Sequence, residues 1–100
     1  MALVKIGKKS NFAAAANCAE ANGKALAVFN IDGKLHCVDN ACSHRGGPLC
    51  EGELDGNTVV CPWHGTPFDV TNGKHLGPPA ATGVTSYKVT LKGDDVFVEM

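Results

Sequence analysis

Two short stretches decide the fold of this chain: CSHRGGPL at residues 42–49 and CPWHGTPFD at residues 61–69. Together they give C-x-H, a sixteen-residue spacer and C-x-x-H, whose members are Cys42, His44, Cys61 and His64. Glycines follow each histidine closely, and glycine lets a loop bend tightly around a bound group. A turn at Asp55-Gly56 in the spacer is expected to fold the second stretch back beside the first. We therefore expect one site with two sulfur and two nitrogen ligands.

Two metal groups suit this set of ligands. A zinc ion binds two cysteines and two histidines in a tetrahedron, but structural zinc sites usually take like ligands from each short motif. Here each loop offers one cysteine and one histidine, which suits a two-iron cluster with thiolates on one iron and imidazoles on the other. The spacing favours the cluster, and zinc is the alternative.

The two stretches resemble the paired cluster-binding loops of Rieske iron–sulfur proteins, over residues from about Ala27 to Leu76. The resemblance implies one Rieske-type 2Fe-2S cluster, a small antiparallel β domain and an electron carrier that is not itself an enzyme. It implies a soluble ferredoxin that takes single electrons from a flavin-dependent NAD(P)H reductase to a terminal non-haem iron oxygenase. The alternative in another class is the small Rieske subunit of an assimilatory nitrite reductase. The ligands implied are Cys42, His44, Cys61 and His64.

The reduction potential is expected to lie at the low end of the family. High-potential members have an extra cysteine in each loop, joined as a disulfide, whereas the matching positions here are Gly46 and Trp63. Those members also have a serine and a tyrosine whose hydroxyls donate to the cluster region, and the matching residues here are Thr66 and Phe68. Because fewer donors stabilise the reduced state less, we expect a potential below about 0 mV, within a Rieske range of about −150 to +300 mV.

Length, charge and hydropathy limit the other possibilities. One hundred residues suit a single domain, expected to span residues 1–100. A net charge of −1 and few aromatic residues give no support for nucleic-acid binding. The longest apolar run, Ala25–Phe29, is far shorter than the ~20 residues that cross a bilayer, and the amino terminus lacks the apolar core of a signal peptide. We expect a soluble, cytoplasmic protein with no membrane partner.

The fold is expected to be all-β, a small antiparallel sandwich or barrel with a cluster-binding subdomain. Turn signals recur along the chain, and Asp32-Gly33, Asp55-Gly56 and Asn72-Gly73 are expected to form hairpin turns. Seven β-rich runs lie between the turns: Leu3–Ile6, Leu26–Asn30, Leu35–Val38, Val59–Cys61, Phe68–Val70, Val84–Leu91 and Val96–Glu99. One short helix is predicted within residues 10–23, because that segment is rich in alanine and ends at Gly23.

The remaining candidate residues are expected to have ordinary structural roles. Cys18, Cys37 and Cys50 are predicted to be small buried or half-buried apolar residues, because an odd number of cysteines in a reducing compartment argues against disulfides. His36 and His75 are predicted to be surface histidines. Arg45 is either solvated or a docking charge. The acidic stretch Glu51, Glu53 and Asp55 is interpreted as a solvated hairpin, with partner steering as the alternative.

Overall fold

A computed structural model describes residues 2–42, 46–63, 65–77 and 82–100 of the chain. The expected all-β class is confirmed, since every pairing of named strands is antiparallel and the helical segments within these ranges are two short 3₁₀ turns. In chain order the elements are β1 Leu3–Lys8, η1 Lys9–Phe12, β2 Ala16–Ala21, β3 Lys24–Ile31, β4 Lys34–Asp39, η2 Leu49–Glu51, β5 Glu53–Asp55, β6 Thr58–Val60, β7 Pro67–Asp69, β8 Ser86–Tyr87, β9 Val89–Lys92 and β10 Asp95–Glu99.

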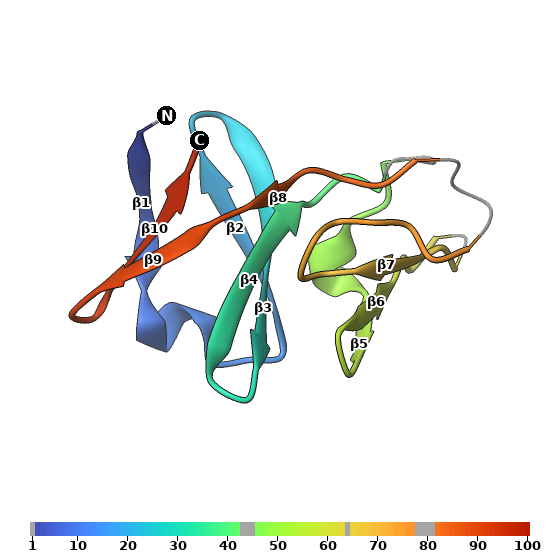
Figure 1. Cartoon of the computed structure of the whole chain (residues 1–100), viewed down its shortest axis with the longest axis horizontal. Coiled ribbons are helices and arrows are strands. Elements are labelled where there is room, and N and C mark those ends of the chain that lie inside the picture. The colour runs from blue at the N-terminus through green and yellow to red at the C-terminus, as the bar shows by residue number, and fades with distance from the viewer. Residues whose placement is uncertain (1, 43–45, 64, 78–81) are drawn as a thin grey trace.

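Three sheets build the molecule (Figure 1). The central sheet has the order β2-β3-β4-β8, and a second sheet of order β1-β10-β9 lies beside it. The third sheet, β5-β6-β7, is inserted between β4 and β8 and lies at the opposite end of the molecule from the two chain ends (Figure 1). All seven β-rich runs predicted from the sequence contain strands, and β2 and β5 are additional.

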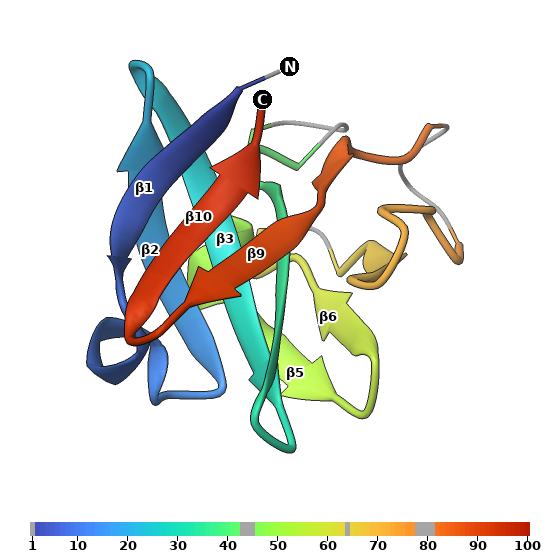
Figure 2. The same cartoon turned by 60° about the vertical axis from the view of Figure 1, so that its left-hand side comes forward.

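Strand β3 explains why the central sheet is buried on both faces. Its side chains alternate between two cores, as period-2 geometry requires, with Leu26 and Val28 on one face and Ala27 and Phe29 on the other. We call the two cores the strand face and the loop face. The strand face comprises Phe12, Ala21, Leu26, Val28, Leu35, Cys37, Val96 and Val98. The loop face comprises Ala27, Phe29, Val38, Cys42, Leu49, Cys50, Val59, Cys61, Phe68 and Val70. Figure 2 shows β1, β10 and β9 side by side in front of β3.

The predicted helix within residues 10–23 is wrong. Only the 3₁₀ turn Lys9–Phe12 is helical, and Ala16–Ala21 forms β2, which pairs with β3 from Ala16↔Phe29 to Ala21↔Lys24. Alanine's helix propensity amounts to tenths of a kcal/mol per residue, so six residues of sheet pairing override it. Asn22 and Gly23 have φ of 52° and 75° and form the two-residue turn of a hairpin, a signal that was interpreted as a helix end.

The expected turns elsewhere are confirmed. Asp32 and Gly33, with φ of 52° and 86°, join β3 to β4. Gly56 lies in the turn between β5 and β6, where Asp55 faces Thr58. Gly73 N–H donates to the Asp69 carbonyl, which turns the chain after β7. These turns bring the two cysteine stretches to the same end of the small sheet.

The segment that leads from β4 to the small sheet lies beside the segment that returns from it to β8. The Asp39 N–H donates to the Thr85 carbonyl at 2.9 Å, so the end of β4 lies against the approach to β8. The Asp39 carboxylate accepts a hydrogen bond from the Tyr87 hydroxyl at 2.6 Å and forms an ion pair with Lys24 at 3.0 Å. Hydrogen bonding to Tyr87, then to Asp39, raises the pKa of Lys24 above its ordinary value. These contacts hold β3, β4 and β8 together at the place where the chain leaves and re-enters the central sheet.

Candidate metal centre

Cys42 and Cys61 begin two turns with the same backbone hydrogen bonds. The Cys42 N–H donates to the Gly47 carbonyl at 2.9 Å, and the Gly46 N–H donates to the Cys42 carbonyl at 2.7 Å. In the second loop the Cys61 N–H donates to the Thr66 carbonyl at 2.9 Å, and the Gly65 N–H donates to the Cys61 carbonyl at 3.0 Å. The two unlike sequences therefore place their cysteines in the same way.

Each turn depends on one glycine in the left-handed region. Gly46 has φ of 75° and Gly65 has φ of 77°, and each lies four residues after its cysteine. A side chain at this φ is strained, so the glycine that follows each histidine closes the loop rather than merely making it flexible. Tight bends at these glycines are expected from the sequence, and the backbone angles confirm them.

The two sulfur atoms lie inside the protein. Cys42 is 3% exposed and Cys61 is 2% exposed, both belong to the loop face, and neither forms a disulfide. A Cβ atom placed on Gly47 would lie 2.7 Å from the Cys61 sulfur and 3.0 Å from Trp63 Cγ. The backbone of the first loop therefore packs against the sulfur of the second, which brings the two halves of the motif together as expected.

These features fit a soft metal group. Buried sulfur donors in a cradle lined by backbone suit iron–sulfur chemistry. The other two predicted ligands, His44 and His64, lie outside the described residues, as does Arg45. Among the residues that the structure describes, no group of three histidine, cysteine or acidic side chains forms an alternative metal site.

The two other histidines belong to no metal-holding group among the described residues. His75 is exposed after the turn that follows β7, and His36 is half-buried on β4. Burial, and then the charge of Lys34, lowers the pKa of His36, whereas the Asp69 carboxylate raises it. The expected surface position is confirmed for His75, while His36 is more enclosed than expected.

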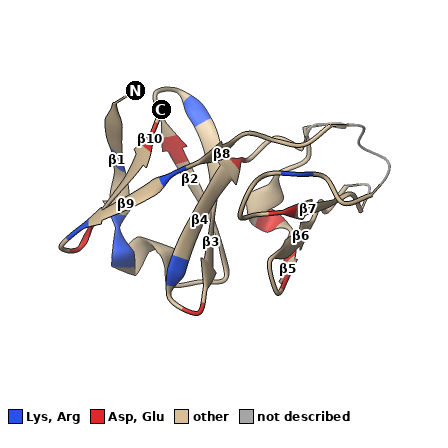
Figure 3. Cartoon of the chain, viewed as in Figure 1, with Lys and Arg blue, Asp and Glu red and all other residues tan. Residues whose placement is uncertain are grey.

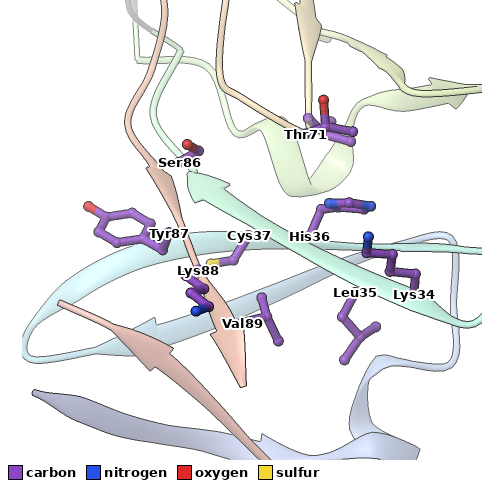
Figure 4. A pocket seen from close by; sticks show the side chains of 10 residues that line it. Lys34, Leu35, His36, Cys37, Thr71, Ser86, Tyr87, Lys88 and Val89 are labelled. Atoms are coloured by element: carbon purple, nitrogen blue, oxygen red, sulfur yellow. The ribbon is translucent and has the colours of Figure 1, made fainter. Parts of the chain in front are cut away.

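His36 lines an open groove of about 610 Å³ between the central sheet and the turn after β7 (Figure 4). The groove is bounded by Lys34, Leu35, His36, Cys37, Val70, Thr71, Ser86, Tyr87, Lys88 and Val89. Neither Cys42 nor Cys61 lines it, so this groove is separate from the candidate metal centre.

Two of the three cysteines outside the motif differ from expectation. Cys37 is 1% exposed, as expected for a small buried apolar residue, and burial raises the pKa of its thiol to about 12. Cys18 and Cys50 instead form a disulfide between β2 and η2, with their Cα atoms 5.0 Å apart. Cys18 is also exposed rather than buried. The pairing was missed because the two residues are 32 positions apart and meet only where η2 packs on β2.

Several exposed apolar side chains lie on or beside the small sheet. Among the described residues these are Val60, Trp63 and Leu76, with Trp63 57% exposed and Leu76 55% exposed. Three acidic side chains, Glu51, Glu53 and Asp55, are exposed on η2 and β5, and Figure 3 shows acidic colour on these elements. Within the described part of the chain, no helix is long and apolar enough to cross a bilayer.

Comparison with known proteins agrees with this architecture. The model of the Rieske [2Fe-2S] domain matches residues 2–88. The ferredoxin component of the naphthalene 1,2-dioxygenase system of Pseudomonas aeruginosa is 32% identical over 78 residues, which cover 78% of this chain and 75% of that protein. The 3-phenylpropionate/cinnamic acid dioxygenase ferredoxin subunit of Escherichia coli K12 is 37% identical over 76 residues, covering 75% of this chain and 72% of that protein.

A solved structure extends the similarity to the whole fold. The ferredoxin of Sphingomonas yanoikuyae B1 superposes with a TM-score of 0.90 at 27% identity and covers 99% of both chains. The match to the domain model, the relatives above 30% identity and the paired cysteine turns all agree. This chain belongs to the Rieske [2Fe-2S] family, whose prosthetic group is a single Rieske-type 2Fe-2S cluster.

Proposed function

We propose that this chain is a single-domain electron carrier over residues 1–100 that moves single electrons from a flavoprotein reductase to a terminal oxygenase. The observation that carries the proposal is the pair of matching turns that bury Cys42 and Cys61 at one end of the small sheet. Relatives that are ferredoxin components of dioxygenase systems support it. A structure titled as a complex of oxygenase and ferredoxin in carbazole 1,9a-dioxygenase, with a TM-score of 0.86 at 26% identity, supports docking to an oxygenase. We propose that it acts in the cytoplasm.

We infer that Cys42 and Cys61 hold one iron and that His44 and His64 hold the other. The chain has four histidines, and neither His36 nor His75 belongs to a group among the described residues that could hold a metal ion, which favours the two loop histidines for the second iron. When bound, the cluster accepts and releases one electron. The protein's part is to fix both thiolates in equivalent turns and to exclude water from them.

The surroundings of the cysteines support a low potential. Phe68 is completely buried in the same core as both cysteines, so an apolar ring lies where a hydroxyl donor would stabilise the reduced state. Thr66 is also fully buried, and its carbonyl accepts from the Cys61 N–H. A loop-to-loop disulfide is absent because Gly46 and Trp63 occupy the two positions that would form it.

The surface beside the cysteines is suited to a transient partner. Trp63 and Leu76 offer exposed apolar area at the end of the molecule where the second loop lies. We propose that this end docks both partners, since electron transfer requires a short path from the cluster. Glu51, Glu53 and Asp55 lie on the flank of the same small sheet and would steer a basic partner surface during encounter.

Redox titration of the purified protein, followed by electron paramagnetic resonance, tests the proposal. We expect iron and inorganic sulfide in equal amounts, a reduced-state spectrum with average g below 2, and a potential below about 0 mV. The variant Cys61→Ser should lose the cluster, whereas Cys37→Ala, a change at a buried thiol outside the motif, should retain it. A protein that contains zinc and no sulfide would contradict the cluster. A protein that stays tightly bound to a large catalytic subunit, rather than exchanging electrons as a monomer, would contradict the carrier.

A further inference from the structure

The Cys18–Cys50 disulfide ties the first cluster loop to the central sheet. Cys18 lies on β2, an edge strand of that sheet, and Cys50 lies in η2, the first element after the Cys42–Gly47 turn. The bond therefore links β2, which lies outside the motif, to η2, which directly follows the turn of the motif cysteine Cys42. It is not a link between the two cluster loops.

Apart from the disulfide, η2 is held by two hydrogen bonds to Asn40 and by packing against β2 and β3. The side-chain oxygen of Asn40 accepts from the Cys50 N–H at 2.8 Å, and its carbonyl accepts from the Leu49 N–H at 2.8 Å. Leu49 is completely buried in the loop face. A three-residue 3₁₀ turn has little stability of its own, so η2 depends on these tertiary contacts, to which the disulfide adds a covalent bond.

The two cysteines of the disulfide differ in exposure. Cys18 is exposed, whereas Cys50 is 7% exposed and Cys37 is 1% exposed. Because Cys18 is the exposed partner, we expect a thiolate from solution to attack its sulfur, which expels the Cys50 sulfur. Disulfides of proteins in a reducing compartment are usually transient and redox-sensing, and exposed ones are the labile ones.

We propose that Cys18–Cys50 is a reversible thiol–disulfide exchange site that controls how firmly the first cluster loop is held. The reductant is a dithiol of the thioredoxin class. Its first thiolate attacks the Cys18 sulfur, forms a mixed disulfide and releases Cys50 as a thiolate that takes up a proton. Its second thiol then attacks the reductant sulfur of the mixed disulfide and releases Cys18 as a thiol. Two electrons and two protons pass to the protein, and the reductant becomes a disulfide; oxidised glutathione reverses the reaction.

Opening the bond is expected to loosen η2 and the turn before it while the sheets remain folded. A disulfide stabilises mainly by limiting the unfolded chain, so its loss favours local as well as global opening. The loop that holds Cys42 should then open more often, which exposes the bound group to solvent. This consequence does not depend on which residues hold the second iron.

The first experiment counts thiols in the folded holoprotein. Protein purified without reductant is alkylated with iodoacetamide, digested without reduction and analysed by mass spectrometry. We expect a cross-linked pair of peptides that contain Cys18 and Cys50. After incubation with dithiothreitol in the absence of denaturant both residues should be alkylated, while Cys37 stays unmodified, and oxidised glutathione should restore the cross-link. Full alkylation of Cys18 and Cys50 before any reductant, or a cross-link that survives excess dithiothreitol, would overturn the proposal.

The second experiment measures how fast an iron chelator bleaches the visible absorbance of the holoprotein. We expect the loss to be roughly three- to tenfold faster after dithiothreitol treatment, because the loop opens more often. The variant Cys18→Ser, an exposed and mild substitution, should bleach at the fast rate with or without dithiothreitol, and Cys37→Ala should behave as the wild type. Equal rates for the closed and opened wild-type protein, or acceleration of Cys18→Ser by dithiothreitol, would refute the link to the cluster loop. The result of the thiol count does not depend on whether the protein carries electrons. Failure of the disulfide proposal can therefore be distinguished from failure of the proposed function.

Discussion

The two faces of the central sheet bury the same strand against very different neighbours. On the strand face, Leu26 and Val28 pack with residues such as Val96 and Val98, which come from regular β-strands. On the loop face, Ala27 and Phe29 pack with residues from η2, β6 and the cysteine turns. The strand face is therefore a conventional sandwich core, whereas the loop face has the two motif cysteines built into its packing.

This difference separates stability from function within one small protein. Apolar packing between sheets tolerates change at a cost set by buried volume. The loop face depends in addition on particular backbone angles, on close backbone–sulfur contact and on a disulfide. Substitutions on the strand face should change stability alone, and those on the loop face should change the cluster.

The largest effect is expected for Gly47→Ala, which should prevent assembly of the site. The added Cβ would lie 2.7 Å from the Cys61 sulfur, closer than real Cβ contacts allow. Gly77→Ala is the matched control, because its Cβ would make only ordinary contact with Pro67 at 3.5 Å. Iron and sulfide content measure the result. Full cluster content in Gly47→Ala would show that the two loops do not need this contact.

The variant Leu26→Ala should lower the free energy of unfolding by about 2–5 kcal/mol and leave the spectrum of the cluster unchanged. Leu26 is completely buried on the strand face, so a cavity forms away from the cysteines. Denaturant unfolding and absorbance spectra check the two parts separately. A shifted cluster spectrum in this variant would mean that the two faces are coupled through β3.

Phe68→Tyr should raise the reduction potential by on the order of 50 mV, provided that the added hydroxyl donates toward the cysteine sulfurs. Phe68 shares the loop face with Cys42 and Cys61, so the substitution places a hydroxyl in the same core as the two cysteine sulfurs. Redox titration measures the shift in potential. The variant Phe29→Tyr is the control, because it buries a hydroxyl in the same core but on strand β3. An unchanged potential would show that the new hydroxyl points elsewhere.

The smallest effect is expected at the edge of the small sheet. The Thr71 hydroxyl and N–H donate to the Asp69 carboxylate at 2.6 and 2.9 Å and lower its pKa, the hydroxyl more strongly. A lowered pKa contributes stability that is present above the ordinary pKa of about 3.9 and is lost as the pH falls below it. Thr71→Val should raise the pKa of Asp69 and weaken this acid sensitivity, as followed by NMR titration, whereas Thr71→Ser should keep it. An identical pKa in Thr71→Val would assign the shift to the backbone alone.

Much of the fold follows from local pattern. The seven β-rich runs and the turns near Gly33, Gly56 and Gly73 were predicted, because β-branched residues and positive-φ glycines act within a few residues. The N-terminal segment was mispredicted for the opposite reason. The alanines of β2 have no strong local preference for a strand, and their pairing with β3 decided their structure.

The sequence alone determined the motif and hence the family, because cluster ligands must be particular residue types at short, fixed spacings within each loop. It also determined the glycines that close both turns, since few other residues adopt those backbone angles. Only the tertiary structure decided that Cys18 meets Cys50, that Gly47 packs on the Cys61 sulfur and that β3 serves two cores. Those contacts join residues far apart in the chain, and their formation depends on how whole sheets pack rather than on any local pattern.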